Sequence, residues 1–163
     1  MVFEDNENYY DKNDLITLME ELIPFNQYLG VKVHRFDRGE ITLKLAAKQI
    51  FTGDPTRGAL HGGIVATLAD TAGGLAVFSV LIKPATTSTI DLRVDYLRPG
   101  RVDQALFAHS KVMRSGSRVC VTQTTIYQES KELPIAISLA AYNIVTHKVL
   151  LTNESITAKQ SHR

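Results

Sequence analysis

The 163-residue chain has a single cysteine, no tryptophan and almost no excess of charge of either sign. One cysteine, Cys120, excludes an internal disulfide framework and is typical of proteins from a reducing cytoplasm. The formal net charge of +1 gives no strong field that would favour nucleic acid or an anionic membrane. The first 14 residues are polar and acidic, unlike a signal or transit peptide. We therefore expect a cytoplasmic protein with neither a nucleic-acid nor a membrane partner.

Several catalytic patterns are also missing from the sequence. The histidines show no metal-ligand spacing, so we expect no metal site. The chain has no Gly-x-Ser-x-Gly elbow, which argues against a serine hydrolase of that type. It also has neither the Rossmann nor the P-loop glycine pattern, so a nucleotide cofactor held in those ways is not expected.

One apolar segment has nearly the length of a membrane span. Residues 64–82 are almost all apolar or small, but Asp70 lies inside the segment and no cluster of Lys and Arg flanks it. Placing a carboxylate in the middle of a membrane span is unfavourable by about 3 kcal/mol on insertion scales. We predict instead a buried helix over about residues 62–82, ended by Pro84.

Alternating apolar and polar residues predict strands on both sides of this helix. Extended runs at 31–36 and 41–45 flank a turn at residues 37–39, and four further runs follow the helix, at 86–97, 104–113, 119–128 and 135–145. In the run 86–97 the alternating apolar residues are Ile90, Leu92, Val94 and Tyr96. An additional helix, capped by Asn13 or Asp14 and reaching Ile23, precedes the first strand.

This order of elements predicts one α+β domain over residues 1–163, in which a six-stranded antiparallel sheet wraps one hydrophobic helix. Its core covers about residues 25–147, and the polar segments 1–12 and 151–163 are expected to be flexible. A helix covered on one side by its own sheet has another face to bury, which favours a homo-oligomer, most simply a two-fold dimer.

Asp70 and the segment His61-Gly62-Gly63 are the candidates for chemistry. An unpaired carboxylate inside an apolar helix is unfavourable. Asp70 therefore either faces a polar cleft and does acid, base or nucleophilic work, or is a structural residue bonded to a nearby backbone group or hydroxyl such as that of Thr67 or Thr71. Two glycines at a helix start leave amides that suit an oxyanion or a polarised carbonyl. Alternatively, the glycines only allow close packing.

The first block of this region closely resembles a known signature. Residues 58–70, Gly-Ala-Leu-His-Gly-Gly-Ile-Val-Ala-Thr-Leu-Ala-Asp, resemble hotdog-fold thioesterases of the phenylacetic-acid-degradation (PaaI-like) branch. Residues 89–100, Thr-Ile-Asp-Leu-Arg-Val-Asp-Tyr-Leu-Arg-Pro-Gly, and the turn at 114–118 are also similar to that family. The resemblance covers about residues 25–147 and implies a hotdog fold.

The resemblance also implies an activity, the hydrolysis of a medium-chain or aromatic acyl-CoA to the free acid and coenzyme A. Asp70 would be the general base or nucleophile, the amide of Gly62 with that of Gly63 would polarise the thioester carbonyl, and His61 would orient the loop or the carbonyl. Thr89 matches a position whose hydroxyl contacts the attacking water, although it also suits an ordinary strand. In such enzymes these groups meet across a dimer interface, and dimers of dimers are expected.

One position departs from the family. Asp54 stands in the loop where the family commonly has an asparagine, and a carboxylate cannot donate a hydrogen bond as an amide does unless it is protonated. The part that this loop plays in holding the substrate is therefore in doubt.

The substrate would need basic residues for its phosphates and apolar residues for its acyl group. The resemblance implies phosphate contacts from arginines at strand ends, which are Arg98, Arg114 and Arg118. The wall of the acyl cleft is expected to include Phe51, Leu75 and Phe78. Coenzyme A is part of the substrate, so no separate cofactor is expected. The alternatives are a non-catalytic acyl-CoA-binding sensor and a hotdog hydratase or dehydratase.

Overall fold

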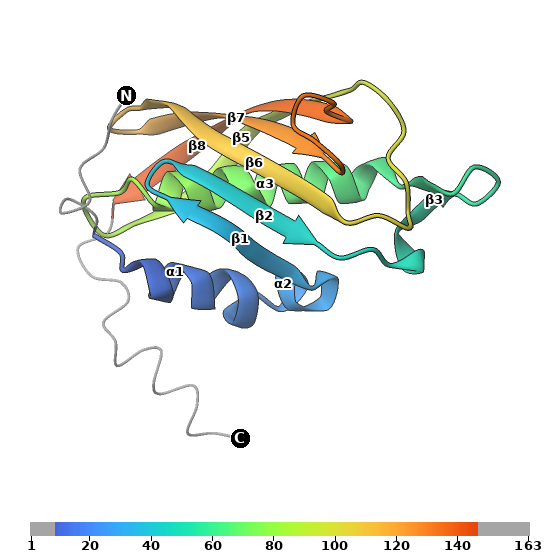
Figure 1. The fold of residues 1–163 in the computed structure, drawn as a ribbon. Helices are drawn as coiled ribbons and strands as arrows, with labels where there is room; N and C mark the ends of the chain where they lie inside the picture. The colour runs from blue at the N-terminus through green and yellow to red at the C-terminus, as the bar shows by residue number, and fades with distance from the viewer. Residues whose placement is uncertain (1–8, 147–163) are drawn as a thin grey trace, which may run out of the picture.

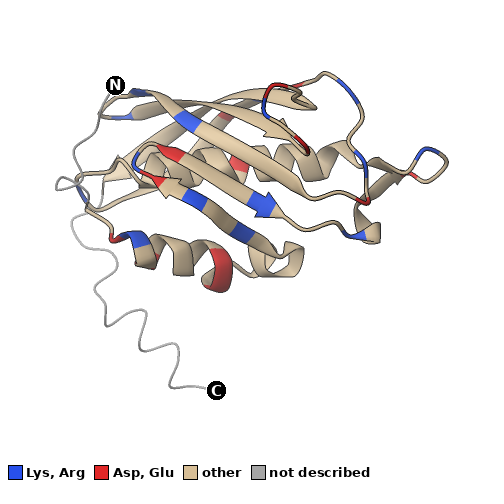
Figure 2. Cartoon of the chain, viewed as in Figure 1, with Lys and Arg blue, Asp and Glu red and all other residues tan. Residues whose placement is uncertain are grey.

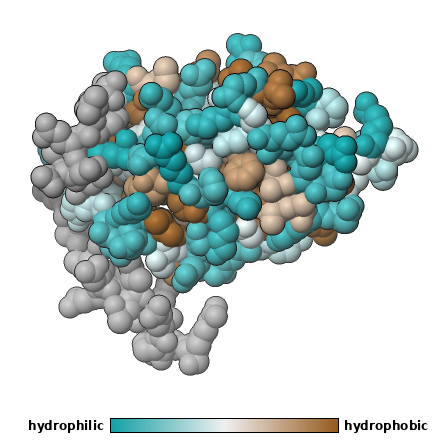
Figure 3. All heavy atoms as spheres, viewed as in Figure 1, coloured by the Kyte–Doolittle hydropathy of each residue, from teal (hydrophilic) through white to brown (hydrophobic). Residues whose placement is uncertain are grey.

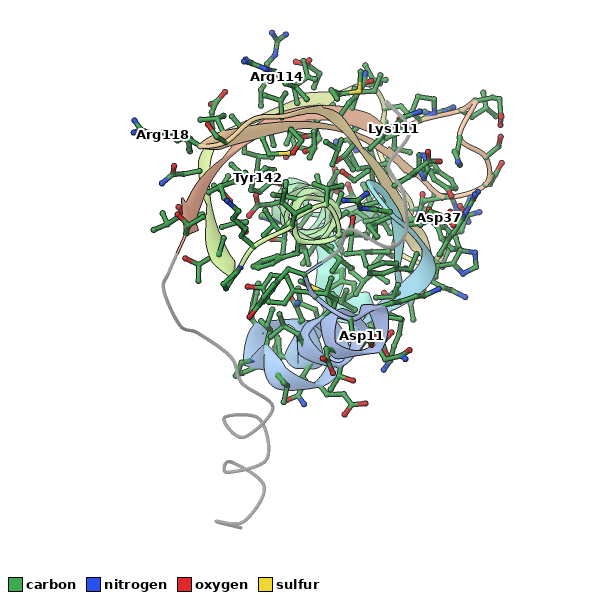
Figure 4. The ribbon with its side chains drawn as sticks, turned by 90° about the vertical axis from the view of Figure 1, so that its left-hand side faces the viewer. Asp11, Asp37, Lys111, Arg114, Arg118 and Tyr142 are labelled. Atoms are coloured by element: carbon green, nitrogen blue, oxygen red, sulfur yellow. The ribbon has the colours of Figure 1, made fainter. Side chains whose placement is uncertain are left out.

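The computed structural model describes residues 9–146, in which one long helix lies inside a curved sheet. The helix is α3 (Gly62–Phe78), and the six antiparallel strands lie in the order β1-β2-β6-β7-β8-β5. Their bounds are β1 (Val31–Asp37), β2 (Glu40–Leu45), β5 (Ala85–Tyr96), β6 (Leu106–Ser115), β7 (Val119–Tyr127) and β8 (Ala136–Thr146). The helix runs along the inner face of the sheet (Figure 1), and the view along the helix shows the sheet curving around it (Figure 4). The predicted α+β arrangement is confirmed.

Helix α3 is buried over most of its length, as its apolar sequence predicts. Its buried residues are Val65, Leu68, Ala69, Ala72, Gly73, Leu75, Ala76 and Val77. The helix ends at Phe78, earlier than predicted, because the Ser79 hydroxyl donates to the carbonyl of Ala76 (2.7 Å) and accepts from the amide of Gly39 (2.8 Å). Within residues 9–146, no helix is both long enough and apolar enough to cross a membrane.

The N-terminal region folds as a broken helical segment that packs beside α3 and β5. Asp11 caps α1 (Lys12–Thr17), a π-helical turn η2 (Leu18–Leu22) follows, and α2 (Pro24–Leu29) begins directly afterwards. The sequence predicted a single helix from Asn13 or Asp14 to Ile23. The second helix was missed because Pro24 was interpreted as a stop, whereas proline at the first position of a helix is favourable.

The two terminal segments expected to be flexible lie mostly outside the described residues. Residues 1–8 and 151–163 lie outside the described residues. Tyr10, inside the segment predicted to be frayed, is half-buried, and its hydroxyl donates to the carbonyl of Ala85 at 2.8 Å. Its ring also meets the edge of Phe78. Tyr10 is therefore joined to both α3 and β5 by side-chain contacts.

Strand β5 forms one edge of the sheet and contains a β-bulge that changes which residues face the helix. Thr89 pairs with Tyr142 and Asp91 pairs with Ala141, so Ile90 is the extra residue. The bulge turns Thr89 toward α3 and leaves Ile90 58% exposed. The predicted alternation is therefore wrong at Ile90, although Leu92 and Val94 are half-buried as expected.

Candidate active site

The carboxylate of Asp70 is held by two hydroxyl groups from the sheet. The Thr89 hydroxyl donates to Asp70 Oδ1 at 2.9 Å. The Tyr142 hydroxyl donates to the backbone carbonyl of Asp70 at 2.9 Å and lies 3.3 Å from Oδ1. Both side-chain contacts are therefore made by the same carboxylate oxygen, which leaves Oδ2 for another partner.

This arrangement shows that the hydroxyl partners of Asp70 come from the sheet, and the catalytic role of Asp70 stays a prediction. A purely local anchor on the helix is excluded, because the Thr71 hydroxyl donates to the carbonyl of Thr67 (2.8 Å) and not to the carboxylate. Thr89 was predicted from the resemblance. Tyr142 was missed, because it lies 72 residues away in the sequence and in an ordinary strand pattern.

Asp70 lines a hollow of about 230 Å³ with an apolar wall at one side. Three elements besides β8 contribute, and their lining residues are Met19, Ile23 and Asn26 from the N-terminal segment, Thr71, Gly74 and Phe78 from α3, and Thr87, Ser88 and Thr89 from β5. Complete ligand sites usually have volumes of about 300–1,000 Å³, so this hollow has the size of a partial site. Phe78 lines this hollow, and its place in an acyl cleft stays a prediction. The N-terminal residues were not predicted, because their contact with α3 depends on the break at the π-helical turn.

Tyr142 reaches Asp70 through a gap in the helix surface. A Cβ atom at Gly73 would lie 2.1 Å from the Tyr142 hydroxyl oxygen and 2.9 Å from Thr122 Oγ1. Glycine is therefore required here by the close approach of the sheet. Burial, and after it the charge of Asp70, raises the pKa of Tyr142 well above the usual value for tyrosine. The phenol consequently remains a hydrogen-bond donor throughout the working range of pH.

We expect Gly73→Ala to lower the free energy of unfolding by about 2 to 4 kcal/mol, since the methyl group would overlap the Tyr142 hydroxyl. Gly74→Ala is the matched control, because a Cβ atom there meets only Tyr142 Cε1, at 3.8 Å. Urea unfolding of both variants measures the difference. Equal stability of the two variants would contradict the close contact at Gly73.

The start of α3 forms a second polar site. His61 is the N-cap of the helix, and its Nδ1 accepts a hydrogen bond from the Gly63 amide at 3.0 Å. Gly62 is the first helical residue, so no carbonyl within the helix can accept from its amide. The Tyr96 hydroxyl donates to the Gly62 carbonyl at 2.9 Å. The amides of Gly62 and Gly63 were predicted to act together. The Gly63 amide is bound by the side chain of the cap residue His61, and the Gly62 amide is not.

Gly62 lines a second hollow, of about 310 Å³, at the N-terminal end of α3. Its other lining residues are Leu60, Val65, Tyr96, Leu97, Arg98, Pro99, Gly100 and Ile135. Eight residues separate Gly62 from Asp70, a distance of about 12 Å along a helix that rises about 1.5 Å per residue. Within one chain, the predicted carbonyl-binding amide and the predicted base therefore lie in two separate hollows.

The loop residue Asp54 is held by its own hairpin. It ends β3 (Thr52–Asp54), which pairs with β4 (Ala59–Leu60) beyond the start of α3 (Figure 1). Hydrogen bonds from Thr56 and Arg57 lower the pKa of Asp54 to about 2. Asp54 is thus an ionised acceptor in this hairpin and does not line the hollow of Asp70.

Two of the predicted cleft residues belong to the core. Leu75 is completely buried and Phe51 is 4% exposed, and neither lines the hollow of Asp70. Leu75 lies on the face of α3 that packs into the core, whereas Phe78 lines the hollow, and the place of both residues in an acyl cleft stays a prediction. Cys120 is fully buried, as predicted, and burial raises the pKa of its thiol to about 11.

The three predicted arginines do not form one group within the chain. Arg98 lines the hollow of Gly62, and its Nε donates to the carbonyl of Pro134 at 3.0 Å. Arg114 and Arg118 flank the β6–β7 turn at the opposite end of the sheet, next to the residues that follow α3. Figure 4 shows both of these side chains on the outer side of the sheet, pointing away from the helix.

The outer surface has a mixed character in the views shown. Basic residues lie along β1, β2 and β6, acidic residues lie beside the β1–β2 turn, and both kinds occur in the connecting loops (Figure 2). Hydrophilic residues cover most of the face in Figure 3, with apolar residues in small groups between them. Within residues 9–146, no group of three or more His, Cys, Asp or Glu side chains is arranged to hold a metal ion.

Comparison with known proteins identifies the class to which this fold and site belong. The family model described as "Thioesterase superfamily" matches residues 57–135, which include His61, Gly62, Asp70 and Thr89. The medium/long-chain acyl-CoA thioesterase YigI of Escherichia coli is 35% identical over 135 residues, which cover 75% of this chain and 86% of YigI. The chain belongs to the thioesterase superfamily and is a thioester hydrolase with the hotdog fold.

Solved structures agree with this assignment. A crystal structure of a Pseudomonas aeruginosa protein is 30% identical and has a TM-score of 0.69, covering 79% of this chain and 98% of that one. A crystal structure of the Haemophilus influenzae thioesterase HI1161 has the same fold, with a TM-score of 0.75 at 21% identity, covering 90% of this chain and 98% of that one. The PaaI-like branch, which is a finer division of the superfamily, stays a prediction.

Proposed function

We propose that this protein hydrolyses medium-chain or aromatic acyl-CoA thioesters to the free acid and coenzyme A, with Asp70 as the reacting group. The observation that carries the proposal is the carboxylate of Asp70, bound through Oδ1 by Thr89 and Tyr142 at the edge of a partly apolar hollow. The printed name of YigI, a medium/long-chain acyl-CoA thioesterase, supports an acyl-CoA substrate.

The chemistry needs one base and one hydrogen-bond donor to the carbonyl. In the general-base route, Asp70 Oδ2 takes a proton from water while the water oxygen bonds to the thioester carbon. The C–S bond then breaks, and the thiolate of coenzyme A takes up the proton. In the nucleophilic route, Oδ2 attacks the carbon itself and the C–S bond breaks, which releases the thiolate and leaves an anhydride. Water then hydrolyses the anhydride, which releases the acid, regenerates the Asp70 carboxylate and provides the proton that the thiolate takes up. In both routes the Gly62 amide donates to the carbonyl oxygen as negative charge develops on it.

The separation of Asp70 and Gly62 leads to a shared site. Strand β5 is 12 residues long, lies at the sheet edge and carries exposed apolar residues, among them Ile90. Such an edge favours pairing with another chain. Antiparallel pairing of two β5 strands about a two-fold axis between Leu92 and Arg93 places Thr89 of one strand opposite Tyr96 of the other. The Asp70 of one subunit then faces the Gly62 of its partner.

This arrangement also assigns the remaining residues. Arg98, beside the Gly62 hollow, binds a phosphate of coenzyme A through its guanidinium group. His61 holds the Gly63 amide and so keeps the Gly62 amide in place. Arg114 and Arg118, at the other end of the sheet, and Asp54, in its hairpin, stay predictions as substrate contacts.

A thiol-release assay with a panel of acyl-CoA substrates tests the proposed function. We expect turnover, with the highest kcat/KM for medium-chain or aromatic acyl groups. Saturable binding of acyl-CoA without release of thiol would instead indicate a binding protein or sensor. Hydration of an enoyl-CoA without thiol release would indicate a hydratase.

The N-terminal segment is expected to limit the length of the acyl chain. Ile23 is half-buried and lines the hollow of Asp70. Ile23→Ala removes three carbons from this wall and should raise kcat/KM for acyl chains two carbons longer by about fifteen-fold relative to the wild type, since each buried methylene contributes about 0.8 kcal/mol. Leu22→Ala is the control, because Leu22 is exposed and outside the wall. The same preference in both variants would contradict this role of the segment.

A further inference from the structure

We propose that Tyr142 is a positioning residue for Asp70: its hydroxyl and that of Thr89 fix Oδ1, so that Oδ2 is presented to the substrate. This role rests on the proposed function of Asp70. Tyr142 itself does not touch the reacting atoms, because its hydroxyl is directed to the backbone carbonyl and Oδ1 of Asp70.

The two hydroxyl groups come from paired positions on neighbouring strands. Thr89 on β5 and Tyr142 on β8 are direct cross-strand partners at the β-bulge. The bulge brings the Thr89 side chain to the inner face, where Tyr142 already points toward α3 (Figure 4). A carboxylate bound at one oxygen from two directions loses its freedom to rotate. The Tyr142 hydroxyl also donates to the backbone carbonyl of Asp70. This bond holds α3 against β8 at the position of Asp70.

The surroundings of Tyr142 keep its hydroxyl protonated, so that it remains a hydrogen-bond donor. It is 2% exposed, and burial raises its pKa, as described above. Two of the residues that line the hollow are titratable, Asp70 and Tyr142. The N-terminal segment contributes Met19, Ile23 and Asn26, none of which titrates. From β7, Cys120 pairs with Tyr142, and its buried thiol is neutral.

If Tyr142 had only a structural role, it would act by filling space in the core. Phenylalanine at this position would fill nearly the same space and so preserve that role. In Tyr142→Phe the ring remains and only the donor is lost. A hydrogen bond donated to a carboxylate favours its ionised form, so loss of the donor should shift the acid limb of the kcat–pH profile to higher pH. Because the carboxylate also becomes free to rotate, we expect kcat to fall about ten-fold, with KM nearly unchanged.

Tyr10→Phe is the matched control. Its hydroxyl donates to the carbonyl of Ala85 at 2.8 Å and accepts from the amide of Ala85 at 3.1 Å, with no contact to Asp70. We expect this variant to lower Tm, because two backbone groups lose a partner, while the acid limb of the kcat–pH profile stays in place.

The measurements are the kcat–pH profile, KM and Tm of the wild type, Tyr142→Phe and Tyr10→Phe with the best acyl-CoA of the panel. A folded Tyr142→Phe protein with the kcat and acid limb of the wild type would overturn the positioning role while leaving the proposed function intact. A shift of the acid limb that also appears in Tyr10→Phe would overturn it as well. Wild-type protein that releases no thiol from any acyl-CoA overturns the proposed function itself.

Discussion

Asp70→Asn is expected to lower kcat for acyl-CoA hydrolysis about a thousand-fold, the scale of a lost general base or nucleophile. The asparagine carbonyl oxygen can still accept hydrogen bonds from Thr89 and Tyr142, so the fold and KM should change little. The amide lacks the negative charge that takes up a proton or attacks the carbonyl carbon. Steady-state thiol release, with Tm as a check on folding, measures the effect.

Asp14→Asn makes the same chemical change elsewhere in the chain. Asp14 is exposed in α1, far from the polar contacts of α3, and its replacement should leave kcat within two-fold of the wild type, or about 0.4 kcal/mol. If Asp70→Asn retained more than a tenth of the wild-type kcat, Asp70 would not be the reacting group. The hollow would then have to work through another residue.

Two inactive variants should restore activity when they share a dimer. Gly62→Pro removes the amide donor at the first helical position, where proline is well tolerated. His61 already has an extended backbone (φ −67°, ψ 128°), which suits a residue before proline. In a heterodimer of Gly62→Pro with Asp70→Asn, one site has lost both groups and the other has both intact. Random mixing gives about half heterodimers, so we expect about a quarter of the wild-type activity.

The control for this experiment keeps the amide. In Gly62→Ala the new Cβ would meet the Tyr96 ring at 3.4 Å, an ordinary contact, so this variant should remain active by itself. Co-expression with two different affinity tags isolates the heterodimer, and light scattering measures its size. A purified heterodimer with no more activity than its two parents, or a fully active wild-type monomer, would contradict a site shared between subunits.

The parts of the fold that could be predicted are those that local pattern determines. The continuous apolar composition of residues 64–82 predicted a buried helix, and period-two alternation predicted the six strands of the sheet. His61 at the cap and Gly62 at the first position follow from the sequence in the same way, because helix starts are decided by the few residues nearest to them.

The parts that could not be predicted depend on contacts between distant segments. The bulge at Ile90 is set by the pairing of β5 with β8, and alternation within β5 alone placed that residue on the wrong face. Leu75 and Phe78 are both apolar residues of one helix. Leu75 lies in the core and Phe78 lines the hollow of Asp70, and only the position of the N-terminal segment makes this difference. The π-helical turn and the start of α2 at Pro24 determine that position.

The sequence by itself therefore determined the family signature, the helix that carries Asp70 and the amide that begins this helix. Only the tertiary structure decided which groups hold the carboxylate and how far the Gly62 amide lies from it. Tyr142 and Asp70 are 72 residues apart, and the contact between them needs the glycine at position 73 and the register of two strands. A hydrogen bond depends on distances of a few tenths of an ångström, which packing fixes and local sequence pattern does not.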